Sequence, residues 1–123
     1  MTQDDEFIAF LLDPLQLMGP VVARRMFGGA GLFLDGVMFA LVSDRVLYFK
    51  VDASSAPDFE ALGLPAFQYP RAGKMINLSY HQAPEQCLDD SDALVDWANR
   101  AYAAARRAAA GAGLRRKKPA GGV

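Results

Sequence analysis

In the stretch GLFLDGVMFALV, residues 31–42, two apolar runs flank the dipeptide Asp35-Gly36. An Asp-Gly pair between apolar segments predicts a β-hairpin, since both central residues of a type I′ turn need positive φ. A second turn signal, Ser43-Asp44, precedes another apolar segment at residues 45–51. The sequence therefore predicts three consecutive antiparallel strands.

Two-residue turns at both places would fix which side chains share a face of this sheet. Leu34 would then pair with Val37, and Leu41 with Val46. One face would carry Leu32, Leu34, Val37, Phe39, Leu41, Val46 and Tyr48, and the other Phe33, Met38, Ala40, Leu47 and Phe49. Both sets are apolar, whereas a sheet with one side in water alternates apolar and polar residues. We expect helices to cover one face, and further strands, a loop or a second copy of the chain to cover the other. A two-fold homodimer through the sheet or the final helix is the expected result.

Three glycines, Gly28, Gly29 and Gly31, precede the first of these strands and allow two interpretations. A phosphate-binding loop would need G-x-G-x-x-G, or G-x-x-x-x-G-K-[ST], leading from a strand into a helix. Here Leu34 stands where the third glycine of the first motif belongs, and the chain continues into a strand. We therefore expect a structural bend, with positive φ at Gly28 or Gly29 or close approach of another backbone.

The rest of the chain predicts helices around a second pair of strands. An N-terminal helix begins at Asp4 or Asp5, and Pro14 should kink or split it near Asp13. Further predicted elements are a strand at 21–26, a short helix after Val51 with Phe59 and Leu62 as apolar contacts, a β pair around the turn 71–74, and a final helix from Asp90 to Gly111. The predicted class is α+β: two layers, with an antiparallel sheet of about five strands packed with an N-terminal, a C-terminal and a short middle helix.

Charge divides the chain into a domain, residues 1–110, and a basic flexible tail, residues 111–123. Residues 1–113 carry nine basic and 14 acidic side chains, a net charge of −5, whereas Arg115, Arg116, Lys117 and Lys118 follow one another near the end. Because nucleic-acid affinity depends on neutralising phosphates, we expect nucleic-acid contact at most through the tail. The acidic N-terminus, six-residue apolar runs and a single Cys87 favour a cytoplasmic protein with no membrane contact.

No constellation of residues indicates catalysis. His81 and Cys87 are the only histidine and cysteine, and they are separated by Pro84, so we expect a rim residue and a buried apolar group rather than a dyad. The acidic residues lie mostly at turns and helix starts, where capping explains them. We predict no enzyme, no cofactor and no metal. The candidate ligand or partner contacts are Arg24, Arg25, Gly28, Gly29, Tyr48, Lys50 and Lys74.

Several short motifs resemble one known family. They are RMFGG at 25–29, GLFLDGxMFALV at 31–42, LYFKVD at 47–52, Phe67-x-Tyr69 and Tyr80-x-x-x-Pro84. In this order and spacing they resemble the N-terminal domain of the TfoX/Sxy competence regulators, over about residues 5 to 108. The resemblance implies a two-layer α+β domain and a bacterial role in regulating competence genes alongside a cyclic-AMP-responsive transcription activator. Full-length members carry a second, helical C-terminal domain, so we expect a stand-alone N-terminal domain here.

Three functional hypotheses follow, and the first is a non-enzymatic regulatory or adaptor protein that acts by protein contact. A small-molecule or anion-binding domain is the second, using the glycine bend with Arg25, Tyr48, Lys50 and Lys74. A nucleic-acid-associated protein that uses the tail is the third. The excess of apolar sheet surface favours the first.

Overall fold

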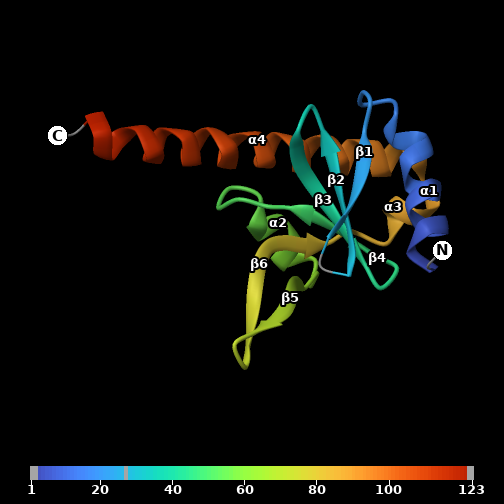
Figure 1. The fold of residues 1–123 in the computed structure, drawn as a ribbon. Coiled ribbons are helices and arrows are strands. Elements are labelled where there is room, and N and C mark those ends of the chain that lie inside the picture. The colour runs from blue at the N-terminus through green and yellow to red at the C-terminus, as the bar shows by residue number, and fades with distance from the viewer. Residues whose placement is uncertain (1–2, 27, 122–123) are drawn as a thin grey trace.

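A six-stranded antiparallel sheet forms the centre of the computed structural model, with the strands in the order β1-β2-β3-β4-β6-β5 (Figure 1). The structure describes residues 3–26 and 28–121, and within these the side chains of residues 4–26 and 28–111. The strands are β1 (Val22–Met26), β2 (Gly29–Leu34), β3 (Val37–Ser43), β4 (Val46–Lys50), β5 (Ala66–Arg71) and β6 (Lys74–Gln82). The helices are α1 (Gln3–Leu15), α2 (Ala56–Ala61), α3 (Gln86–Asp89) and α4 (Ser91–Gly121). The predicted α+β class is confirmed, with six strands instead of about five, and with α3 as a helix that the sequence did not predict.

The turn between β2 and β3 is the predicted one. Asp35 and Gly36 have φ of 52° and 79°, the left-handed values that a type I′ turn requires. The turn between β5 and β6 has the same character, with φ of 53° at Ala72 and 80° at Gly73. Both hairpins could thus be recognised from local turn chemistry.

The turn between β3 and β4 lies one residue later than predicted. Asp44 and Arg45 have φ of 53° and 61°, so they are its central residues, and Val46 pairs with Ser43 instead of Leu41. The backbone N–H of Arg45 donates a hydrogen bond to Oδ1 of Asp4 in α1 over 2.7 Å. This long-range contact stabilises the turn at a position that local sequence does not mark.

A bulge in β3 changes the predicted faces of the sheet. Leu32 pairs with Ala40 and Phe33 with Met38, so Phe39 is an extra residue in β3. The two successive residues Phe39 and Ala40 both belong to the core, as expected when a bulge interrupts alternation. The core face of the sheet therefore carries Leu32, Leu34, Phe39, Ala40, Val42, Leu47 and Phe49. The predicted division, which separated Leu47 and Phe49 from Leu32 and Phe39, is wrong because it assumed unbroken alternation.

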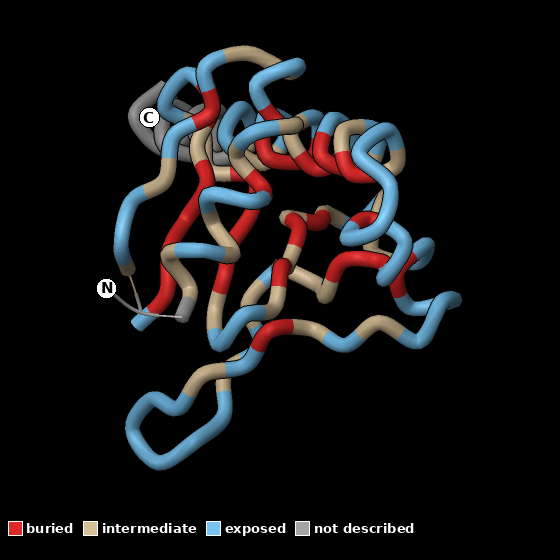
Figure 2. Tube along the Cα trace, turned by 90° about the vertical axis from the view of Figure 1, so that its right-hand side faces the viewer, coloured by how far each residue is buried: buried red, intermediate tan, exposed pale blue. Residues whose placement is uncertain are grey.

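The four helices of the described residues pack on this core face. Each contributes a buried side chain to the same cluster: Leu11 from α1, Phe59 from α2, Cys87 from α3 and Leu94 from α4. Figure 1 shows α4 crossing behind β1, β2 and β3, and Figure 2 shows the buried segments of strands and helices facing one another. The fold thus has two layers, as predicted, and α4 is the main cover of the sheet.

Three helix details differ from the expectations. Pro14 neither kinks nor splits α1 near Asp13, because it lies in the last turn and the helix ends at Leu15. Leu62 is 58% exposed, so Phe59 alone supplies the buried contact of α2. The backbone of α4 continues past Gly111 to Gly121. The side chains of the basic tail, Arg115, Arg116, Lys117 and Lys118, lie outside the described residues, and the division into residues 1–110 and 111–123 stays a prediction.

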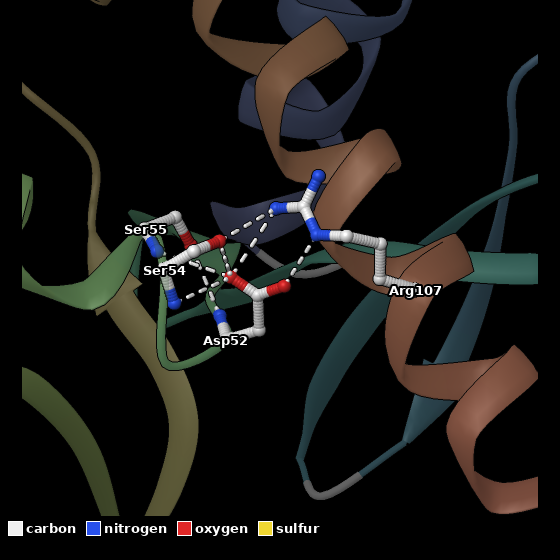
Figure 3. A network of polar contacts seen from close by, with 4 residues as sticks. All are labelled: Asp52, Ser54, Ser55 and Arg107. Atoms are coloured by element: carbon white, nitrogen blue, oxygen red, sulfur yellow. Dashed lines mark hydrogen bonds and ion pairs between the residues drawn. The ribbon is translucent and has the colours of Figure 1, made fainter.

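A polar network ties α4 to the loop that follows β4 (Figure 3). Arg107 donates from Nε to Oδ2 of Asp52 over 2.6 Å and from a terminal nitrogen to Oδ1 over 3.2 Å. Oδ1 of Asp52 also accepts hydrogen bonds from the backbone N–H groups of Ser54 and Ser55. The Arg107 guanidinium is the main reason that the pKa of Asp52 lies far below its usual value.

Candidate functional site: the open face of the sheet

The face of the sheet opposite the helices carries a cluster of apolar side chains, which we call the open-face cluster. Leu41 pairs with Gly31 on one side and with Tyr48 on the other, so these residues share this face. The ring of Tyr48 meets that of Phe67 edge-on, with 5.0 Å between centroids. The cluster consists of Met26, Phe33, Met38, Leu41, Tyr48 and Phe67. Leu41 is fully buried and Phe67 is 7% exposed, whereas the other four are half-buried.

Gly31 lies under the centre of this cluster and has no side chain to keep neighbours away. A Cβ at this position would lie 2.9 Å from Sδ of Met38, 3.0 Å from the Phe33 ring and 3.1 Å from Sδ of Met26. Such separations are shorter than ordinary carbon contacts. Gly31 therefore lets Met26, Phe33 and Met38 pack directly over bare backbone, and a larger residue there would make these side chains shift.

Two cations flank the open-face cluster. The guanidinium carbon of Arg24, on β1, lies 5.2 Å from the centre of the Phe33 ring. Nζ of Lys50, on β4, lies 5.2 Å from the centre of the Tyr80 ring and 2.6 Å from Oγ of Ser79. Burial lowers the pKa of Lys50, and the nearby Asp52 opposes this effect. Burial also raises the pKa of Tyr80 to about 12, so its hydroxyl remains protonated at neutral pH.

The predicted contact residues fall in three separate places. Arg24, Tyr48 and Lys50 lie on the open face. Arg25 points to the helix side, where it forms a 2.9 Å ion pair with Asp5 of α1. Lys74 is exposed beside the turn that joins β5 and β6, at the end of the hairpin seen at the bottom of Figure 1. The proposed small-molecule contacts Arg25, Tyr48, Lys50 and Lys74 thus do not converge on one cavity.

The glycine bend is confirmed. Gly28 has φ of 74° and lies in the turn between β1 and β2. Gly29 pairs with Met26, and a Cβ there would clash with the carbonyl oxygen of Val42. These glycines shape the hairpin, and the loop leads into a strand and not into a helix.

His81 and Cys87 occupy the places expected of structural residues. Nδ1 of His81 lies 2.7 Å from the carbonyl oxygen of Leu64, and its ring lies beside that of Phe59. Cys87 is buried, and burial raises the pKa of its thiol to about 11, so it is not activated as a nucleophile. Within the described residues, His81 and Cys87 thus have different contact partners.

Two kinds of feature are absent from the described residues, 3–26 and 28–121. No group of three or more histidine, cysteine and acidic side chains is placed to share a metal ion. None of the helices in these ranges combines the length and apolarity needed to cross a bilayer.

Most of the open-face cluster escaped the sequence analysis. Tyr48 was among the predicted contacts, but Met26, Met38, Leu41 and Phe67 were not. The spacing of residues 31–42 did place apolar side chains on both faces, which is the one signal that pointed to this surface. The bulge at Phe39 decides which of them face away from the helices, and no local residue pattern marks it.

Comparison with known proteins places this fold in a family. Residues 13–105 match the TfoX N-terminal domain. The chain is also 34% identical over 68 residues to DNA transformation protein TfoX1 of Aliivibrio fischeri. That alignment covers 55% of this chain and 32% of the relative, so the chain spans about a third of that protein. By the match over residues 13–105, the chain belongs to the TfoX N-terminal domain family.

Proposed function

We propose that this chain is a regulatory protein that acts in bacterial competence by binding another protein, without catalysis of its own. The family and the relative named a DNA transformation protein support a competence-regulator-like role. The binding partner is a component of the transcription machinery, as the resemblance to competence regulators implies. Binding to that partner takes place on the open face.

The open-face cluster is the observation that carries this proposal. Half-buried methionines and aromatic rings lie side by side on a face on which no described helix packs. Methionine, aromatic residues and arginine are enriched at protein interfaces, and methionine adapts to irregular partner surfaces. Arg24 and Lys50 at the border favour a partner with acidic side chains around an apolar centre.

Neither alternative has comparable support. The residues expected to bind a small molecule are spread over two faces and a hairpin tip. The tail residues expected to contact nucleic acid have side chains outside the described residues. Protein contact is therefore the function that the geometry supports best.

A pair of methionine variants tests the proposal. Met38→Lys places a charge in the open-face cluster, while Met75→Lys makes the same change on the β5–β6 hairpin, where Met75 is 58% exposed. The immobilised protein is exposed to lysate of the native host, and bound proteins are quantified by mass spectrometry. We expect one partner to bind wild type and Met75→Lys but not Met38→Lys, with all three equally folded by circular dichroism. Equal capture by Met38→Lys and wild type would contradict the proposal.

A further inference from the structure

A hollow of about 210 Å³ lies between α1, α3 and the start of α4, on the helix side of the molecule. Its apolar lining includes Phe10 and Leu88, which are 54% and 40% exposed. Leu88 also lines an adjoining hollow of about 260 Å³ beside the start of β4. Two large apolar side chains thus border a concave surface that is distinct from the open face.

Every charged side chain that lines these hollows is acidic. Asp13, Asp89 and Asp90 line the first, which we call the acidic hollow, and Glu85 lines the second. Asp90 caps α4 by accepting hydrogen bonds from backbone N–H groups. Among the described residues, no ion pair involves any of these four carboxylates. An occupant that fits this surface combines an apolar side chain with several cations.

The chain itself contains a segment of this chemistry. Leu114 is followed directly by Arg115, Arg116, Lys117 and Lys118, one large apolar residue before four cations. The backbone of α4 leads from Ser91, which lines the acidic hollow, past this segment to Gly121. At about 1.5 Å per residue, residue 116 lies about 38 Å from Ser91 along the helix axis. The segment therefore lies too far along the helix axis to reach the hollow of its own molecule.

The shape of α4 makes a reciprocal contact feasible. Figure 1 shows the C-terminal part of α4 extending beyond the sheet and the other helices. Two such helices placed antiparallel bring the basic end of each to the acidic start of the other. Both contacts form at once, so the arrangement closes with two-fold symmetry and leaves no free end.

We propose that two copies of the chain form a two-fold dimer in which residues 114–118 of each copy occupy the acidic hollow of the other. This inference is independent of the proposed function, because it uses the helix side and leaves both open faces accessible. The homodimer expected from the sequence then forms through the helix side of the molecule and not through the sheet.

Sedimentation equilibrium of the full chain tests the dimer. At about 50 µM protein and about 50 mM salt we expect a species of twice 13.3 kDa, shifting towards 13.3 kDa at about 500 mM salt, because ion pairs at the rim are screened. Reversing charge in the hollow with Asp13→Lys and Asp89→Lys should raise the dissociation constant at least about tenfold, and so should Arg115→Glu with Arg116→Glu. Combining the four changes should restore the dimer, because the ion pairs re-form with opposite sign.

A matched control is the double variant Asp58→Lys with Glu60→Lys, which changes two exposed acids on α2. It should dimerise like wild type. A wild-type monomer under these conditions overturns the inference, and so does a dimer that persists in both charge-reversed variants. A dimer that persists in them but dissociates in Met38→Lys places the interface on the open face and equally overturns it.

Discussion

Gly28 and Gly29 are adjacent, yet each is glycine for a different physical reason. Gly28 has φ of 74° with open space around the position of a Cβ, so only its backbone conformation favours glycine. Gly29 has no positive φ, but it lies against the carbonyl oxygen of Val42 in β3. The sequence predicted a bend from the glycines, but it could not distinguish the two causes, because the second depends on a strand 13 residues further along the chain.

Substitutions at these two glycines should differ in cost. Gly29→Val should lower the free energy of unfolding by about 1–3 kcal/mol or more, because the backbone of β2 or β3 must move. Gly28→Asn should cost less than about 1 kcal/mol, since asparagine tolerates the left-handed region. Urea denaturation measures both. Equal costs at the two positions would contradict the assignment.

The Asp52–Arg107 ion pair should make stability depend on acid pH. Its hydrogen bonds hold the pKa of Asp52 below the ordinary value of 3.8. A carboxyl whose pKa is lower in the folded state stabilises the protein above its unfolded pKa, and this contribution disappears as pH falls.

Because Arg107 is half exposed, we expect Arg107→Gln to lower the melting temperature only modestly at pH 7. The difference from wild type should shrink below about pH 4. Thermal unfolding at several pH values checks this, and a difference that stays constant down to about pH 2 would count against the ion pair.

For the secondary-structure elements, the turn residues predicted the hairpins correctly. The alternation of apolar residues did not predict correctly which side chains share a face of the sheet. Asp35-Gly36 and Ala72-Gly73 form turns where the sequence placed them, because positive φ is a local requirement. The bulge at Phe39 and the turn at Asp44-Arg45 depend on packing and on a hydrogen bond from α1. Neither leaves a local signal, so the predicted faces were wrong beyond the first hairpin.

The packing of α4 on the sheet gives a prediction for the whole element. Ala98 is fully buried against the core, so a larger side chain there must push the helix away from β3. Ala98→Leu should lower the free energy of unfolding by about 1–3 kcal/mol through overpacking. Ala109→Leu makes the same change at an exposed position of the same helix, and it should be nearly neutral. Similar losses in the two variants, measured by urea denaturation, would show that Ala98 is not tightly packed.

For the whole molecule, the sequence predicted the two-layer packing. It did not predict where apolar and acidic side chains gather on the surface. Apolar residues on both faces of strands 31–51 indicated that one face would lack a helix, and this is the open face. The acidic hollow was invisible, because it joins Asp13 of α1 to Asp89 of α3, and α3 itself was not predicted. A site formed by segments that are far apart in the chain can be predicted only when the packing of the helices is known. The spacing of residues along the chain does not give that packing.

If the open face serves a competence-regulator-like role, as we propose, expression of competence genes in the native host should depend on that face. Strains that carry wild type, Met38→Lys or Met75→Lys at equal protein levels are compared for transcripts of DNA-uptake genes under competence-inducing conditions. We predict that Met75→Lys matches wild type and that Met38→Lys matches a deletion strain. Wild-type transcript levels in the Met38→Lys strain would contradict the claim.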